Sequence, residues 1–359
     1  MAKIDLTRKM YNEAFSQRMT FSRYLETLDP SGDGDKLDAF ERQLKERGII
    51  TRSNYAKGIN ASTVEEAFGG GYRTEDNDIL FPEYIGRTVR EVMTNDVMLA
   101  ALIGQYTTIN SNAYKSIWCD DQPDEARFKR VTESSNLPKA KIKTRETEVK
   151  IYKYGRAIEA SYEVIRRMQL DLLAKHVGRF GAQAAKDKVS EILTVVQDGD
   201  GNNNAAPTLN LTALDTETTT GNLTAKAWIN FLMQFEEFPA NTIIASKDAF
   251  LAILLTDLGT MSAADVLKVL SQGATSGISL TIPQLPKNNI NMFWHPDVAD
   301  GKVIGMNKEN TIEQITEAGS DIHEADRFIT NQTQILTMSE NSGFSKMFKE
   351  AAKVMDLGA

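Results

Sequence analysis

Residues 170–201, LDLLAKHVGRFGAQAAKDKVSEILTVVQDGDG, hold the strongest helical pattern in the chain. Apolar residues recur there at intervals of three and four, the repeat of a helix with one buried face. A helix over 170–196 is about 40 Å long, and the Gly-rich run that follows supplies its stop signal. The side chains expected on the buried face of this helix are Leu173, Val177, Phe180, Ala184, Val189, Ile192 and Val196.

An extended and basic segment precedes this helix. Lysines recur at every second residue from Lys139 to Lys143, which places them on one side of a strand. A polar stretch ending at Pro138 separates this strand from another at 128–131. The pattern predicts a long, exposed hairpin over 120–150. Because a two-stranded ribbon is marginally stable alone, we expect a neighbouring subunit to support it.

Positive charge is concentrated in residues 127–153, which overlap the predicted hairpin. The chain has 41 Lys and Arg and 49 Asp and Glu, a net charge of −8. Residues 127–153 contain nine basic and three acidic residues, so they carry +6 and the remainder carries −14. A basic projection on an acidic body suits self-association, although a solvated lysine-rich loop is the alternative. The basic residues that we expect to contact a neighbouring subunit are Arg127, Lys129, Arg130, Lys139, Lys141, Lys143 and Arg145.

The segments before the predicted hairpin and after the long helix have mixed helix and strand patterns. An amphipathic pattern over 81–118 predicts helix, with its apolar stripe between Ile85 and Leu102. After the long helix, 241–245 is typical of a short buried strand, and Ser246 is placed to cap the helix that follows. Alternation over 327–339 predicts a closing strand. The chain is therefore expected to have an α+β fold.

Length and composition exclude several classes of protein. A chain of 359 residues is long enough for two or three domains, and 41% hydrophobic with 25% charged residues is typical of soluble globular proteins. The longest apolar runs, 97–103 and 249–255, are too short to cross a bilayer. No apolar block follows the first ten residues, so we expect no secretory signal. The single Cys119 favours a reducing compartment, and the net negative charge argues against a dedicated nucleic-acid binder.

Reactive residues are sparse. The chain has three histidines and one cysteine, and neither His-Glu-x-x-His nor Cys-x-x-Cys occurs. The group from Asp321 to Asp326, with His323 and Glu324, suits either a divalent ion or a polar turn ahead of a strand. We therefore expect no enzymatic activity, no cofactor and no metal ion.

Several short motifs occur in an order and at a spacing that are typical of a known protein family. They are Val131-Thr132-Glu133 before the hairpin tip, Ala160-Ser161 and Val164-Ile165 ahead of the long helix, Gly199-Asp200-Gly201 at its end, Asn241 to Ser246 with Phe250-Leu251, Asp326 to Ile329, and Ser342-Gly343-Phe344. Through this order and spacing, residues 79–354 resemble the major capsid proteins of tailed bacteriophages with the Hong Kong 97 type fold. Each motif alone is weak, and none is catalytic.

The resemblance implies a division of the chain into the family's parts. The hairpin corresponds to the E-loop, which in that family lies over an adjacent subunit; the long helix corresponds to the spine of the peripheral P-domain; and the mixed block corresponds to the A-domain, which lies around pentamer and hexamer centres. Many relatives lose an N-terminal segment by proteolysis, which we do not expect here because the chain begins at Met1. The implied parts are an N-terminal arm at 1–78, P-domain segments at 79–119, 151–200 and 320–359, the E-loop at 120–150, and the A-domain at 201–319.

The resemblance also implies a function. It indicates a major capsid protein that self-assembles, as pentamers and hexamers, into the icosahedral head enclosing the double-stranded DNA of a tailed phage. Its expected partners are other copies of itself, a scaffolding protein, a portal and a possible decoration protein, with DNA enclosed without specific binding and no membrane contact. It would be found in the virion after assembly in the host cytoplasm. One alternative is an encapsulin-like nanocompartment shell, which the long N-terminal arm argues against. The other is an enzyme or binding module, which no group of residues in the sequence supports.

Overall fold

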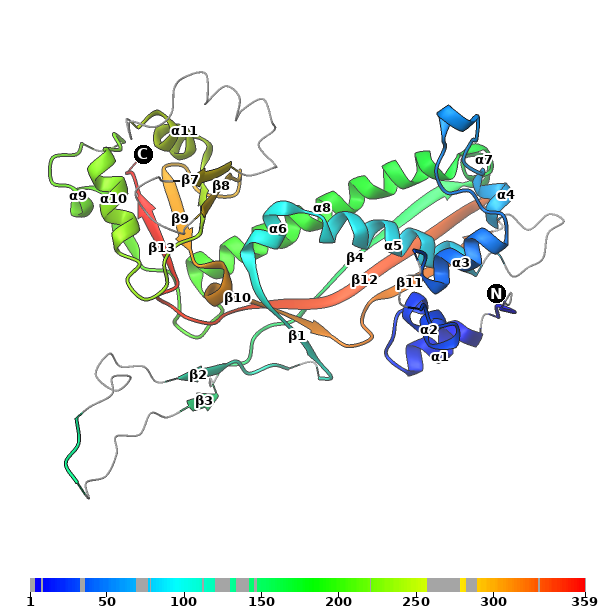
Figure 1. The fold of residues 1–359 in the computed structure, drawn as a ribbon, viewed down its shortest axis with the longest axis horizontal. Coiled ribbons are helices and arrows are strands. Elements are labelled where there is room, and N and C mark those ends of the chain that lie inside the picture. The colour runs from blue at the N-terminus through cyan, green and yellow to red at the C-terminus, as the bar shows by residue number, and fades with distance from the viewer. Residues whose placement is uncertain are drawn as a thin grey trace. The chain divides into compact units, whose positions relative to one another are not determined.

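The computed structural model has an α+β fold made of two compact units. Unit 1 comprises Met1–Asp96, Tyr152–Lys186 and Thr316–Ser342, and unit 2 comprises Val97–Ile151, Asp187–Ile315 and Gly343–Ala359. Figure 1 shows the course of the chain. The residues that the structure describes are 4–7, 9–32, 36–68, 77, 79–111, 113–119, 130–133, 142–144, 147–219, 221–256, 278–281, 289–328 and 330–358.

Unit 1 is built from helices packed on a three-stranded part of a sheet. The long helix α8 (Leu170–Asp198) begins in this unit. The other helices and strands of the unit are α1 (Lys9–Ser16), α2 (Phe21–Leu28), α3 (Ala39–Glu46), the 3-10 helix η1 (Tyr55–Lys57), α4 (Val64–Phe68), α5 (Leu80–Thr94), β4 (Tyr152–Ser161), α7 (Tyr162–Arg167), β11 (Ile322–Phe328) and most of β12 (Thr333–Lys346).

In unit 1 the strand β12 lies between β11 and β4 and is antiparallel to both. The register pairs Leu336 with Ala325 on one side and with Ile158 on the other. Leu336 and Met338 are buried on the face that packs against the helices, in one cluster with residues of α5 and α8. Alternate residues of β4, such as Glu159, are exposed on the other face. The core of unit 1 therefore lies between the helices and one face of these strands.

Unit 2 is built around a six-stranded sheet. Its strand order is β5-β13-β9-β6-β8-β7, in which β5/β13 and β6/β8 are parallel pairs. Trp228 and Phe231 of the covering helix α10 are buried against the sheet. The helices and strands of the unit, besides the end of α8, are α6 (Val97–Leu102), β1 (Ile103–Ile109), β2 (Ile117–Cys119), β3 (Ile142–Thr144), β5 (Thr208–Asn210), α9 (Leu211–Leu214), α10 (Ala225–Met233), β6 (Thr242–Ala245), α11 (Lys247–Leu255), β7 (Ile278–Thr281), β8 (Asn289–Trp294), β9 (Lys302–Met306), α13 (Lys308–Thr311), most of β10 (Ile312–Glu317) and β13 (Ala352–Asp356).

Several local predictions are confirmed. The helix predicted over 170–196 is α8, with 29 residues, and Gly199 follows it in the left-handed conformation, at φ +86°. The predicted buried strand at 241–245 is β6, all of whose residues are buried. Ser246 caps α11 as expected, because its side chain accepts a hydrogen bond from the backbone N–H of Ala249.

Two predicted boundaries are wrong. The helix predicted over 81–118 is divided into α5, which ends at Thr94, and α6, which ends at Leu102, and the chain then continues as the strand β1. The strand predicted over 327–339 is split, because β11 ends at Phe328 and β12 begins at Thr333. Between them lies a turn in which Gln332 has a positive φ of 52°. Local apolar periodicity did not reveal either change of direction.

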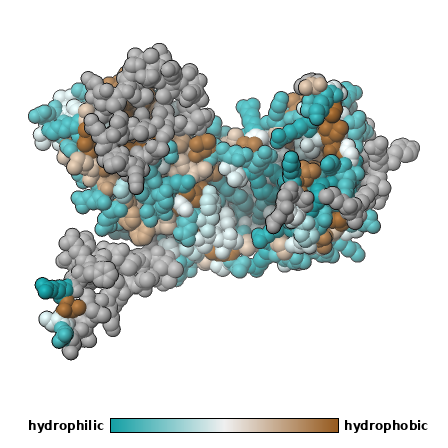
Figure 2. Space-filling model, viewed as in Figure 1, coloured by the Kyte–Doolittle hydropathy of each residue, from teal (hydrophilic) through white to brown (hydrophobic). Residues whose placement is uncertain are grey.

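The surface of the described residues is mainly polar. Hydrophilic residues predominate on the face drawn in Figure 2, with hydrophobic residues between them. Within the part of the chain that the structure describes, no helix combines the length and apolarity needed to span a bilayer.

Candidate assembly elements

Helix α8 contributes a buried stripe to both units. Of the seven residues predicted for its buried face, Val177, Val189, Ile192 and Val196 have at most 2% of their surface exposed. The remaining three, Leu173, Phe180 and Ala184, are partly exposed in the isolated subunit.

Phe180 has a polar environment on one side. The guanidinium carbon of Arg156, on β4, lies 5.1 Å from the centre of the Phe180 ring, a cation–π distance. Its side chain is therefore covered by a charged group on that side. Sequence periodicity places Phe180 on the apolar stripe but does not reveal that Arg156 packs over its ring.

Other residues of α8 are buried although they were not predicted to be. Leu170 and Ala185 are at most 1% exposed, and each lies one turn from, or next to, a predicted core position. The helical spacing was a usable signal for both. Lys188, with 5% exposure, is also buried, and nothing in the local pattern distinguishes it from the exposed lysines of the same helix.

A close approach between α8 and α5 fixes the packing of unit 1. A Cβ atom added at Gly181 would lie 2.9 Å from the carbonyl oxygen of Val89 and 3.3 Å from its Cα. At Gly178 the nearest atom to such a Cβ would be a methyl carbon of Val92, at 3.3 Å. Gly181 therefore allows backbone contact between the two helices, and Gly178 meets only a side chain.

Replacing Gly181 with alanine is expected to lower the free energy of unfolding by about 1–3 kcal/mol, the usual range for overpacking. The new methyl group meets backbone atoms of Val89, which move only if the whole of α5 shifts. Gly178→Ala is the matched control, and it is expected to be neutral or stabilising because alanine favours helix by roughly 0.5–1 kcal/mol over glycine. Urea denaturation of both variants measures the difference. Equal effects at the two positions would contradict the assigned close approach.

The end of α8 is tied to β12 by a buried polar cluster in unit 2. One carboxylate oxygen of Asp200 accepts hydrogen bonds from Ser345 Oγ and from the backbone N–H of Lys346, both at 3.0 Å. The side-chain amide of Asn204 donates to the carbonyl of Lys346 at 3.0 Å. The ammonium group of Lys346 donates to the carbonyl of Val196 at 3.3 Å, in the last turn of α8. The Gly-Asp-Gly motif thus holds two elements that are distant in sequence.

The predicted hairpin lies largely outside the described residues. Its described strands β2 and β3 pair antiparallel, with Trp118 opposite Lys143. Of the residues predicted to contact a neighbouring subunit, Arg130 is exposed, and the backbone of Lys143 lies in β3. Those outside the described residues are Arg127, Lys129, Lys139, Lys141 and Arg145.

The base of the hairpin is anchored by a buried carboxylate. The hydroxyl of Tyr114 donates to the carboxylate of Glu313, on β10, at 3.0 and 3.1 Å. Thr107 of β1 also donates its hydroxyl proton to Glu313, which is 6% exposed. Burial, followed by the nearby charge of Glu313, raises the pKa of Tyr114 to about 12. The two sides of the hairpin base are also joined by their backbones, because the backbone N–H of Val149 donates to the carbonyl of Tyr114 at 2.8 Å.

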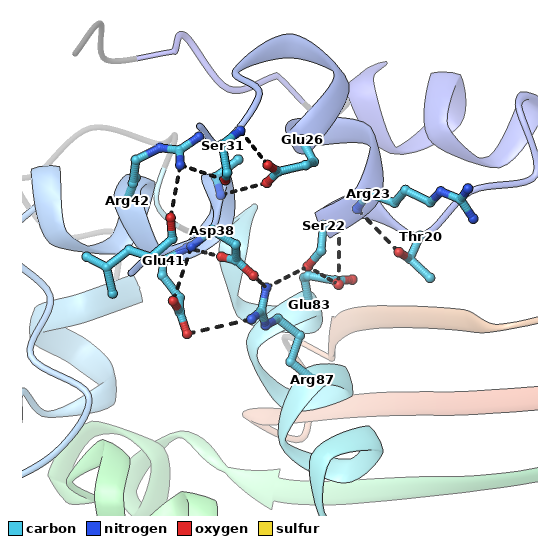
Figure 3. Close-up of polar contacts among 12 residues, drawn as sticks. Thr20, Ser22, Arg23, Glu26, Ser31, Asp38, Glu41, Arg42, Glu83 and Arg87 are labelled. Carbon is cyan, nitrogen blue, oxygen red and sulfur yellow. Dashed lines mark hydrogen bonds and ion pairs between the residues drawn. The ribbon is translucent and has the colours of Figure 1, made fainter. Parts of the chain in front are cut away.

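The N-terminal helices are attached to α5 by ion pairs and hydrogen bonds, drawn in Figure 3. Arg87 lies 2.5 Å from the carboxylate of Asp38, the N-cap residue of α3, and 3.7 Å from that of Glu41. The hydroxyl of Ser22, on α2, donates to Glu83 at 2.5 Å. Apolar residues of α2 and α3 also share the main cluster of unit 1. The described residues of the segment 1–78, which was expected as an arm, therefore contribute to the same compact unit as α5.

Two members of the group considered as a metal site, Asp321 and His323, are engaged in ion pairs. Asp321 lies 2.5 Å from Arg90 Nη1 and 2.7 Å from His323 Nε2, and the other end of the Arg90 guanidinium lies 2.6 Å from Glu83. The His323 ring lies against Gly86, where a Cβ would be 2.7 Å from it. Among the described residues, no group of three or more His, Cys, Asp or Glu side chains is arranged to hold a metal ion.

Asp321 gives an expected dependence of stability on pH. Burial raises its pKa, but the hydrogen bond and charge of His323, with those of Arg90, outweigh burial and lower the pKa from 3.8 to about 2. Because the folded-state pKa is depressed, the stabilisation is complete above about pH 4 and is lost as the pH falls toward 2. Thermal melts should show Asp321→Asn less stable than wild type at pH 7, with a shallower decline between pH 4 and 2. Parallel declines would contradict the ion pairing of Asp321.

Comparison with known proteins assigns the family. Residues 144–332 match the family model described as phage capsid protein, which is more than half of the chain. The chain belongs to the phage capsid protein family. It is a capsid shell protein, and the helix α8 lies within the matched region. No curated protein matches the sequence.

Solved capsid structures share the fold. The capsid of a native GTA particle aligns with a TM-score of 0.51 at 11% identity, covering 73% of this chain and 91% of that one. A phage-related protein from Bordetella bronchiseptica RB50 aligns with a TM-score of 0.50 at 13% identity, covering 77% and 97%. These likenesses confirm the predicted capsid fold. An encapsulin complex from Synechococcus elongatus PCC 7942 aligns with a TM-score of 0.46 at 10% identity, covering 74% and 89%, which is too low to favour the encapsulin alternative.

Proposed function

We propose that this capsid protein self-assembles, as pentamers and hexamers, into the icosahedral head of a tailed phage and encloses its double-stranded DNA. The observation that carries the proposal is the family match, which begins in β3, at the end of the hairpin, and extends through α8 to the turn before β12. The phage capsid family is structural, so the subunit acts through its contacts with other copies.

The parts of the subunit have separate proposed roles. The hairpin at 120–150 acts as the E-loop that lies over an adjacent subunit, and the segments at 79–119, 151–200 and 320–359 form the P-domain around α8. The block at 201–319 acts as the A-domain at the pentamer and hexamer centres. The first 78 residues form the N-terminal arm. Its packing into the core of unit 1 favours an arm that stays with the subunit.

The contacts at the hairpin base support its role in assembly. A ribbon with little core of its own requires external support, and Glu313 provides this at the base through Tyr114 and Thr107. Residues 127–153, which overlap the ribbon and carry +6, are proposed to gain support for it from the acidic surface of a neighbouring copy. A scaffolding protein, a portal and a decoration protein are proposed as further partners during assembly in the host cytoplasm.

Loss of the anchor at Glu313 is expected to weaken assembly more than folding. Glu313→Ala removes the charged acceptor of the half-buried hydroxyls of Tyr114 and Thr107, and a hydrogen bond to a charged group contributes about 1.5–3 kcal/mol. Asn341, which donates to Glu317 farther along β10 at 2.6 Å, provides a matched control as Asn341→Ala. Particle yield by sedimentation and the melting temperature of the subunit should be measured together. A normal particle yield for Glu313→Ala would contradict the anchoring role.

Electron microscopy of the purified protein tests the proposed function. Closed shells are expected, and particles isolated from the phage host are expected to contain nuclease-protected duplex DNA. Closed shells that hold a protein cargo and no DNA would instead favour the encapsulin-like compartment. Failure to form any closed shell, alone or with a co-expressed scaffolding protein, would overturn both.

A further inference from the structure

One face of α8 in unit 1 is exposed and basic. The exposed residues follow the helical repeat along one side, and they are Leu172, Lys175, His176, Arg179, Gln183 and Lys186. Three of the six are Lys or Arg, and the exposed Asp187, one turn after Gln183, is the acidic residue that borders them. We call Lys175, Arg179 and Lys186 the α8 basic stripe. At 1.5 Å per residue, the stripe extends about 17 Å along the helix axis.

Most of the positive charges of this stripe have no acidic partner among the described residues. Among the described residues, Arg179 and Lys186 form no ion pair or hydrogen bond through their side chains. Lys175 lies one turn after Asp171, whose pKa is lowered first by a hydrogen bond from Ser53 and to a lesser extent by Lys175. Two of the three cations therefore have no acidic partner within the part of the chain that the structure describes.

We propose that the α8 basic stripe contacts the phosphate backbone of the duplex DNA enclosed by the shell. This inference rests on the proposed function. A duplex presents about one negative charge per 1.7 Å of its axis, so roughly ten phosphates lie along the length of the stripe. Long Lys and Arg side chains on an exposed helix face reach phosphates without a fitted pocket, and such contacts carry no sequence information.

The composition of the stripe favours nucleic acid over an acidic protein. The core of a protein interface is enriched in aromatic residues and depleted in lysine, and its binding energy is concentrated in buried anchors. Leu172 is the one large apolar side chain on this exposed face, at 46% exposure, and the face has no aromatic residue. Repeated cations without an apolar centre suit a uniformly charged polymer.

This contact is weak and sensitive to salt. The chain outside residues 127–153 carries −14, which opposes tight binding of DNA. Three phosphate contacts correspond to a slope of about −2.7 in log K against log salt, or about 40-fold in affinity between 50 and 200 mM salt. A wall with such contacts holds DNA locally without selecting any sequence, as expected for DNA enclosed without specific binding.

The test compares two triple variants of the full-length subunit. Lys175, Arg179 and Lys186 are replaced together by glutamine, which is a good helix former, and Lys139, Lys141 and Lys143 are replaced in the same way as the control. Filter binding of duplex DNA is measured from 50 to 200 mM salt, with circular dichroism to verify folding. The α8 variant is expected to reduce the steepness of the salt dependence by about 2.7, and the control is expected to retain most of it. An unchanged slope in the α8 variant would overturn the proposal.

A second measurement uses DNA-filled heads. Formaldehyde crosslinking followed by trypsin digestion is expected to yield DNA-bound peptides containing Lys175 or Lys186. Recovery of DNA-bound peptides only from other segments would overturn the contact. An α8 variant with unchanged DNA binding that no longer retains an acidic assembly protein would overturn it in favour of a protein partner. Closed shells by electron microscopy in each case keep failure of this inference separate from failure of the proposed function.

Discussion

Replacing Ile192 with alanine is expected to lower the free energy of unfolding by about 2–5 kcal/mol. Ile192 is 0% exposed on α8, so the substitution removes buried methyl groups and leaves a cavity in unit 2. A subunit that has lost this much of its marginal stability is expected to accumulate as insoluble protein. Denaturant unfolding of the soluble fraction and the yield of particles measure the effect.

Phe180→Ala is the matched control on the same helix. It removes more atoms than Ile192→Ala, but Phe180 is partly exposed and lies beneath Arg156. The expected loss is therefore smaller than the 3–5 kcal/mol typical of a fully buried phenylalanine, and it includes about 0.5–1 kcal/mol from the cation–π contact. If Phe180→Ala proved more damaging than Ile192→Ala, the orientation of α8 would be wrong.

Replacing Lys139, Lys141 and Lys143 together with glutamate is expected to abolish efficient assembly. The change removes six charge units, which brings residues 127–153 from +6 to neutral. The proposed attraction to the acidic body of a neighbouring subunit is then lost. Single replacements are expected to have little effect, because an exposed ion pair contributes about 0–1 kcal/mol.

Particle yield and resistance to salt measure this effect by sedimentation. The triple replacement with arginine is the control, since it preserves the charge and is expected to assemble normally. A triple glutamate variant with normal yield and salt resistance would show that electrostatic docking of the hairpin is not required for assembly.

Sequence periodicity predicted the elements whose formation depends on local pattern. Helix α8 is long and amphipathic, so its 3.6-residue repeat is visible without knowledge of what covers it. The cap of α11 by Ser246 is likewise local. The strand β1 was missed because its apolar start continues the run of α6, and its extended state depends on pairing with β10, about 200 residues later. The turn after β11 had a weak signal in Asn331, a residue common in turns.

The polar contacts of the assembly elements were not predictable from the sequence. Arg87 and Asp38 are 49 residues apart, and Tyr114 and Glu313 are 199 apart. No repeat or motif links such partners, since only the completed fold brings them together. Lys346 has no exposed surface, although lysine is among the residues least often buried. The close approach of α5 and α8 had one usable signal in the sequence. Gly178 and Gly181 are three residues apart, so they lie on the same face of α8.

The backbone contact at Gly181 has a mechanical consequence for unit 1. Packed helices commonly adjust to a change of state by sliding along each other, which requires side chains between them that change rotamer. Here the carbonyl of Val89 lies against a position without a side chain. Sliding α8 along its axis would bring the side chain of a residue one turn away on the same face, such as Ala185, toward that carbonyl, so sliding is sterically hindered. In any rearrangement of the shell, we therefore expect α5 and this part of α8 to move together as one rigid body.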